Sequence, residues 1–184
     1  MPVFTAHTAE TAPATARRAI EGVRGRFGWL PTPVALMADS PQLLTGFLTA
    51  SAGFEQTDLA PLEREVVILT VSTTNECHFC VALHTGTLTQ LGATPELIDA
   101  LRSDAELPDP RLEALRRFTL AVLKHRGAVP DGELDDFLAA GYQPRHALDV
   151  VLGVGAYTIS TFANRLTRAP LDPPLAAHAW TPAA

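Results

Sequence analysis

The chain contains little cysteine, little charge and few aromatic residues. Its 184 residues include two cysteines, 18% charged residues and 7% aromatic residues, against 47% hydrophobic residues. A net charge of -6 without any run of Lys or Arg disfavours nucleic acid and anionic membranes as partners. No basic N-terminal start precedes an apolar stretch, and the most apolar region, residues 147–163, is short for a membrane span. We expect a cytoplasmic protein with a single domain over residues 1–184, and its apolar composition is consistent with buried subunit interfaces.

Strand patterns are also scarce. Only residues 66–71, Val-Val-Ile-Leu-Thr-Val, are rich in β-branched residues and would fit a buried strand. A strand before a Cys-x-x-Cys helix is the thioredoxin pattern. That fold needs further strands and a proline-bearing loop facing the cysteines, and the sequence contains neither. We therefore predict an all-α fold.

Proline, capping residues and apolar spacing place the expected helices. Together these signals predict helices over residues 13–27, 34–38, 41–54, 61–73, 77–91, 94–101, 111–125, 130–141 and 144–166. Ser40 and Asp58 are the expected N-caps of the third and fourth helices, and Gly92 is the expected C-cap of the fifth. The tail from Ala169 to Ala184 is rich in Pro and Ala, and we expect it to be extended.

The two cysteines are separated by two residues and are followed by a histidine. Cys77, Cys80 and His84 occupy positions i, i+3 and i+7, which share one face of a helix. In a cytoplasmic protein such a pair is more often catalytic or metal-binding than a structural disulfide. The spacing therefore predicts that both sulfurs and the imidazole point into one small volume.

A proton path to these sulfurs is available in the sequence. The thiolate is the reactive form of cysteine, and a free thiol has a pKa of about 8.5. Cys77 lies near a helix start, where amide dipoles favour an anion, and His84 lies one turn after Cys80 and could accept its proton. Glu65 flanks the apolar stripe of the preceding helix. If the two helices pack antiparallel, Glu65 could contact His84 and complete a relay.

Other interpretations of the same residues stay open at this point. The cysteines could be two ordinary core residues, and Glu65 could be a solvated charge in a first helical turn. Zinc usually has four Cys or His ligands. Cys77, Cys80 and His84 would supply three of them, with Glu65 or His78 as the fourth.

The whole segment resembles a known family. Leu62-Glu63-Arg64-Glu65, an apolar helix, then Asn75-Glu76-Cys77-His78-Phe79-Cys80 and His84 resemble the core of the AhpD-like alkylhydroperoxidases in the carboxymuconolactone decarboxylase superfamily. Ser40-Pro41 and Asn164-Arg165-Leu166 are similar to segments of its peroxidase-related branch, so the likeness covers about residues 30–172, with extensions at both ends expected to pack on this core or on a neighbouring subunit.

The resemblance carries expectations about activity and assembly. It implies an all-helical homo-oligomer, a trimer or hexamer, that reduces peroxides through thiols without haem, flavin or metal. Glu65, Cys77, Cys80 and His84 would form its active site. Alkylhydroperoxidase D has a second histidine directly before the second cysteine, where this chain has Phe79, so the relay would be shorter. The decarboxylase branch lacks the cysteine pair, which argues against lactone decarboxylation.

The expected reaction is a dithiol cycle. Glu65 orients His84, His84 takes the proton from Cys80, and Cys80 attacks the peroxide to form a sulfenic acid that Cys77 resolves to a disulfide. An external dithiol of lipoyl or thioredoxin type would then reduce the enzyme. The helix start favours Cys77 as the attacking thiol and the histidine favours Cys80, and we expect Cys80. The alternative is a non-catalytic oligomeric module that senses oxidants or binds a ligand between its helices.

Overall fold

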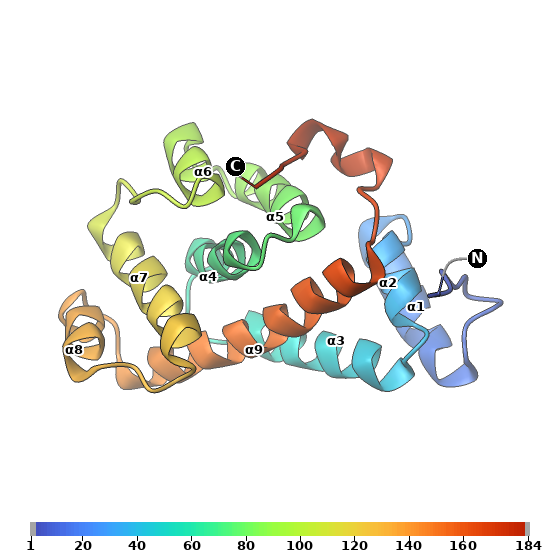
Figure 1. The fold of residues 1–184 in the computed structure, drawn as a ribbon, viewed down its shortest axis with the longest axis horizontal. Coiled ribbons are helices and arrows are strands. Elements are labelled where there is room, and N and C mark those ends of the chain that lie inside the picture. The colour runs from blue at the N-terminus through green and yellow to red at the C-terminus, as the bar shows by residue number, and fades with distance from the viewer. Residues whose placement is uncertain (1–2, 183–184) are drawn as a thin grey trace.

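The computed structural model describes residues 3–182, and every regular element in that range is a helix. Figure 1 shows their arrangement. The elements are α1 (Ala14–Phe27), α2 (Thr32–Met37), α3 (Pro41–Glu55), α4 (Pro61–Thr74), α5 (His78–Gln90), α6 (Pro95–Arg102), α7 (Pro110–His125), α8 (Asp131–Ala139), α9 (Pro144–Thr167) and the 3-10 helix η1 (Pro173–His178). The all-α prediction is confirmed, and the ends of the predicted domain, residues 1–2 and 183–184, lie outside the described residues.

Proline defines where many of these helices begin. Five of the α-helices carry it at their first position, where the missing amide hydrogen is not needed and the fixed φ suits a helix. These residues are Pro41, Pro61, Pro95, Pro110 and Pro144. Side-chain caps support some of these starts: the Ser40 hydroxyl accepts a hydrogen bond from the amide of Leu43, and the Thr94 hydroxyl accepts one from that of Leu97.

Two local predictions are wrong. Asp58 does not cap α4; the Glu63 carboxylate instead accepts a hydrogen bond from the amide of Ala60 at 2.8 Å, and Asp58 pairs with Arg145 at 2.6 Å. The tail is not extended throughout, because residues 173–178 form η1, which packs on α5. The two prolines that open η1 are compatible with a first helical turn, which composition alone did not distinguish from an extended chain.

Helix α4 lies at the centre of the molecule. It contacts α3, α5, α6, α7 and α9, and in Figure 1 it lies between α5 above and α9 below. Residues 66–71, the segment that resembles a strand, are all buried inside this helix. A helix surrounded on all sides has no polar face, so its sequence lacks the usual amphipathic period and resembles a buried strand.

The longest helix, α9, crosses α3 and α4 at a glycine. A Cβ atom added at Gly153 would lie 2.8 Å from two ring carbons of Phe54 and 3.0 Å from Cγ1 of Val67. Real Cβ atoms do not approach other atoms so closely, so glycine is required for this crossing. The close approach brings the C-terminal half of α9 beside the start of α5 (Figure 1).

By length and hydropathy alone, α9 could also cross a membrane. It is the one helix in residues 3–182 with this property, and 44% of its most apolar window is buried inside the fold. Contacts with α2, α3, α4, α5 and α7 explain that burial. The helix is therefore packed within this fold, and the cytoplasmic location stays a prediction.

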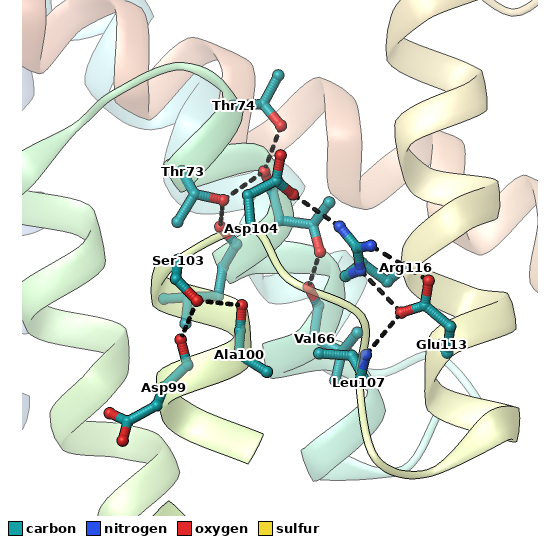
Figure 2. A network of polar contacts seen from close by, with 12 residues as sticks. Val66, Thr73, Thr74, Asp99, Ala100, Ser103, Asp104, Leu107, Glu113 and Arg116 are labelled. Atoms are coloured by element: carbon teal, nitrogen blue, oxygen red, sulfur yellow. Dashed lines mark hydrogen bonds and ion pairs between the residues drawn. The ribbon is translucent and has the colours of Figure 1, made fainter. Parts of the chain in front are cut away.

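An ion-pair network fixes the connection between α6 and α7. Figure 2 shows the Arg116 guanidinium between the carboxylates of Asp104 and Glu113, at 2.6 Å from the first and 2.9 Å from the second. Glu113 also accepts a hydrogen bond from the amide of Leu107 at 3.0 Å. None of these residues lines the cavity described below, so we assign them to stability.

Candidate active site

Both cysteines lie at the N-terminal end of α5. Cys77 is the N-cap residue, and its sulfur accepts a hydrogen bond from the amide of Cys80 at 3.4 Å. The sulfur atoms are 2.6 Å apart, and both thiols are free and buried. A covalent disulfide measures about 2.05 Å, so oxidation requires only a small movement. The predicted convergence of the two sulfurs is present.

The surroundings of the two sulfurs give them opposite acidities. The hydrogen bond from Cys80 lowers the pKa of Cys77 from its ordinary 9.0 to about 7, assisted by the Cys80 amide and Asn164 and opposed by burial. Burial raises the pKa of Cys80, and the adjacent Cys77 raises it further. When the pair loses one proton, the negative charge therefore lies on Cys77 and the remaining proton on Cys80.

Glu65 and His84 form a buried pair between α4 and α5. The Glu65 Oε2 atom lies 2.8 Å from His84 Nδ1, and their side chains are 11% and 13% exposed. The predicted contact between the helices is therefore present. A carboxylate can only accept hydrogen bonds, so Nδ1 donates and Nε2 is left to exchange a proton. Within residues 3–182 no hydrogen bond joins His84 to either sulfur, so the expected transfer from Cys80 to His84 has no direct path.

A cavity of about 190 Å³ connects these groups. Glu65, Cys80 and His84 line it, whereas Cys77 does not. Its walls are otherwise largely apolar and include the side chains of Phe27, Val34, Phe47, Phe54, Phe79 and Leu83. An apolar cavity with a few convergent polar groups is typical of a small-molecule site. A larger hollow of about 940 Å³ elsewhere on the surface has no cysteine or histidine in its lining.

Three polar residues of α9, none of them predicted as a site residue, also line this cavity. Tyr157, Ser160 and Asn164 are at positions i, i+3 and i+7, and so share one face of the helix. The Tyr157 ring contacts His84 edge to face, with centroids 5.4 Å apart. Ser160 Oγ lies 3.9 Å from the Cys80 sulfur. Polar side chains on one face of a mostly apolar helix were the signal that could have identified them.

The C-terminal segment packs against the dithiol. Leu171 and Leu175 pack with Trp29 against the cluster that contains both cysteines. Asp172 holds one end of this segment by accepting a hydrogen bond from the amide of Thr32 at 2.9 Å. At the other end, the Trp180 indole donates to the carbonyl of Arg102 at 2.8 Å. The segment therefore contributes to the burial of the two sulfurs.

The remaining residues of the motif have separate environments. His78 is half-buried and does not line the cavity. Phe79, which stands where alkylhydroperoxidase D has its second histidine, lines the cavity and adds apolar surface to its wall. In the described part of the chain, no three His, Cys, Asp or Glu side chains are arranged to hold a metal ion.

Comparison with known proteins agrees with these features. The sequence profile of the carboxymuconolactone decarboxylase family matches residues 38–129, half of the chain. No curated protein matches the sequence.

Several solved structures share the fold. A peroxidase-related protein with the alkylhydroperoxidase AhpD core from Ralstonia eutropha JMP134 superposes with a TM-score of 0.82 at 22% identity, over 94% of this chain and 93% of that one. A peroxidase-related protein from Silicibacter sp. TM1040 gives 0.76 at 19% identity, over 94% of each chain. The debrominase Bmp8 gives 0.75 at 15% identity, over 97% of this chain and 96% of that one.

Proposed function

The chain belongs to the carboxymuconolactone decarboxylase family, and from its site we propose that it is a thiol-dependent oxidoreductase that reduces hydroperoxides through its Cys-x-x-Cys dithiol. One observation carries the proposal. Cys80 and the Glu65–His84 pair line one apolar cavity, and Cys80 lies 2.6 Å from the acidic thiol of Cys77. A nucleophile, a proton donor and a resolving thiol are thus grouped around a space for a small substrate.

The first step is attack by Cys80. Its proton passes to the Cys77 thiolate across the short sulfur–sulfur contact, which leaves the charge on the sulfur that lines the cavity. The Cys80 thiolate then attacks the distal oxygen of the hydroperoxide, so that a sulfur–oxygen bond forms while the oxygen–oxygen bond breaks. The departing alkoxide takes a proton from Nε2 of protonated His84, whose Nδ1 is held by Glu65. The products are an alcohol and a Cys80 sulfenic acid.

The second step closes the disulfide. Cys77 attacks the Cys80 sulfur, the sulfur–oxygen bond breaks, and the thiol proton leaves with the hydroxyl as water. The short contact between the sulfurs supports fast resolution and little accumulation of sulfenic acid. An external dithiol, of lipoyl or thioredoxin type, then returns two electrons and two protons. A small dithiol can use the cavity, whereas a protein reductant has to displace the C-terminal segment that packs on the dithiol.

Assembly into a homo-oligomer is part of the same proposal. Large apolar side chains on α9 are exposed in the single chain, with Leu148 at 72%, Phe162 at 59% and Leu166 at 70%. Apolar surface of this kind on one helix is typical of an interface. A second copy of the chain is the partner that the expected trimer or hexamer would supply.

Steady-state consumption of hydroperoxide tests the proposal. Alkyl hydroperoxides and hydrogen peroxide are supplied with dihydrolipoamide or with a thioredoxin system. We expect turnover that disappears in Cys77→Ser and in Cys80→Ser, falls in His84→Gln, and is unchanged in His125→Gln, a histidine outside the cavity.

Two outcomes would replace the proposal. Absence of cysteine-dependent turnover with every peroxide and reductant would favour the non-catalytic redox module. Because the debrominase Bmp8 shares the fold, a bromopyrrole is tested as a second substrate, and its exclusive turnover would reassign the reaction.

A further inference from the structure

We propose that Asn164 is a further catalytic residue, whose amide nitrogen stabilises the negative charge on both cysteine sulfurs and whose amide oxygen orients the hydroperoxide. Its first role follows from contacts with the dithiol. Its second role rests on the proposed function.

The amide of Asn164 contacts both sulfurs. Nδ2 lies 3.2 Å from the sulfur of Cys80 and 3.7 Å from that of Cys77. A primary amide carries two N–H donors, and a thiolate is an acceptor without a donor of its own. The same group can therefore donate to whichever sulfur is charged. This matches a reaction in which the charge moves from Cys77 to Cys80 before attack.

The next residue along α9 fixes the turn that presents the cysteines. Arg165 donates to the carbonyl of Asn75 at 2.6 Å and to the Glu76 carboxylate at 2.8 Å. Glu76 has φ of 50°, a left-handed conformation that is uncommon for a residue other than glycine. Arg165 thus holds the turn between α4 and α5 from outside while Asn164 contacts the sulfurs from inside. The Cys-x-x-Cys segment is attached to α9 at both points.

The other end of the Asn164 amide has no partner. The residue is 4% exposed and lines the cavity, and within residues 3–182 its Oδ1 atom accepts no hydrogen bond. A buried carbonyl oxygen without a donor is unfavourable, so such an atom calls for a ligand that donates to it. The hydroperoxide supplies that donor, since its distal oxygen carries a hydrogen.

These features combine in one geometry for attack. Nδ2 of Asn164 donates a hydrogen bond to the Cys80 sulfur, and Oδ1 accepts one from the distal O–H group of the hydroperoxide. The amide thereby holds the distal oxygen beside the sulfur that attacks it. The hydrogen stays on that oxygen, which becomes the hydroxyl of the sulfenic acid, so the amide neither gains nor loses a proton. Asn164 is the group that aligns the oxygen–oxygen bond, and His84 is the group that protonates the oxygen that leaves.

Substitution separates the two roles. Asn164→Ala removes donor and acceptor, and Asn164→Asp keeps the shape but removes the donors and adds negative charge. The matched control is Gln90→Ala, which removes an exposed side-chain amide at the end of α5 opposite to the cysteines. Thiolate formation is followed by ultraviolet absorbance against pH, and reactivity by single-turnover rates with iodoacetamide and with cumene hydroperoxide.

The donor role predicts a change in thiol acidity. We expect the thiolate midpoint to rise by about one pH unit in Asn164→Ala, so that the iodoacetamide rate at pH 7 falls about five-fold, and to rise further in Asn164→Asp. The Gln90→Ala midpoint should match that of the wild type. Unchanged midpoints in both Asn164 variants would overturn the donor role.

The acceptor role predicts a loss specific to the peroxide. The cumene hydroperoxide rate of Asn164→Ala should fall by more than the iodoacetamide rate, and equal losses would overturn this role. A different outcome is that peroxide oxidises neither thiol of the wild type while the thiolate midpoints of the Asn164 variants still rise as expected. In that case the proposed function fails and the donor role of Asn164 stands.

A measurement on the wild type covers variants that fail to fold. With ¹⁵N-asparagine labelling, the chain has two side-chain amides, Asn75 and Asn164. The Asn164 signals should shift with the thiolate titration and on disulfide formation, and by more than those of Asn75, whose amide contacts neither sulfur. An Asn164 amide insensitive to both would contradict the proposal.

Discussion

Replacing Cys80 by alanine tests the origin of the acidity of Cys77. The largest cause of that acidity is the hydrogen bond from the Cys80 thiol, at 2.6 Å. Alanine removes this donor and leaves the Cys80 amide at 3.4 Å and the Asn164 amide at 3.7 Å in place. Burial, which opposes ionisation, remains. The pKa of Cys77 should therefore rise.

The size of the effect follows from the pKa values. With a pKa of about 7, Cys77 is half ionised at pH 7. A return to the ordinary value of 9.0 leaves about 1% as thiolate at pH 7, and so slows alkylation about fifty-fold. In Cys80→Ser a hydroxyl donor stays near the sulfur, so the rise should be smaller. Because the native pKa is lowered, reactivity is present above about pH 7 and is lost as the pH falls below it.

The assay is the rate of iodoacetamide labelling between pH 5 and pH 10. Each variant has one cysteine, so the labelled residue is unambiguous. In the reciprocal variant Cys77→Ala, burial should keep the midpoint of Cys80 above its ordinary range. A midpoint that stays near pH 7 in Cys80→Ala would show that the Cys80 thiol is not the cause, because the helix N-terminus and His84 would then account for the acidity of Cys77.

Three further predictions concern the relay, the helix crossing and the assembly. Glu65→Gln removes the charge that holds His84, so peroxide turnover should fall by about 10²-fold while the thiol midpoints stay unchanged, and a full rate would remove Glu65 from the mechanism. Gly153→Ala should lower the free energy of unfolding in urea by about 1–3 kcal/mol through overpacking. Gly155→Ala, whose added Cβ atom would meet no atom of a neighbouring element within 4 Å, should raise it by about 0.5–1 kcal/mol. Equal changes in the two variants would contradict the crossing geometry. Phe162→Glu should convert the oligomer to smaller species in sedimentation, and a monomeric wild type would reject the interface.

Much of the fold could be predicted from local signals. Prolines and caps fixed the helix starts, since their backbone geometry depends on the nearest residues. The failure of Asp58 to cap α4 could not be predicted, because it depends on Glu63, which accepts the hydrogen bond from the amide of Ala60, and on Arg145, which lies far along the chain and pairs with Asp58. The turn at η1 depends on packing against α5, which no local pattern records.

The site was predictable where its residues are close in sequence. Cys77, Cys80 and His84 share one helix, and Glu65 lies on the helix before it. Asn164 comes from α9, which reaches the dithiol through the crossing at Gly153. The order of acidity of the two thiols depends on burial and on distances between sulfurs, and these are properties of the folded chain. Because Cys77 is the more acidic thiol, the charge rests on Cys77, and the proton of Cys80 is proposed to pass to Cys77 and not to His84 as expected from the sequence.

The most direct test of the account is a single turnover without any reductant. Fully reduced protein is mixed with one equivalent of an alkyl hydroperoxide and examined by intact mass, peptide mapping and alcohol analysis. We predict one equivalent of alcohol, the loss of two hydrogens from the protein, and one disulfide between Cys77 and Cys80. Unconsumed hydroperoxide with both thiols still free would contradict the account.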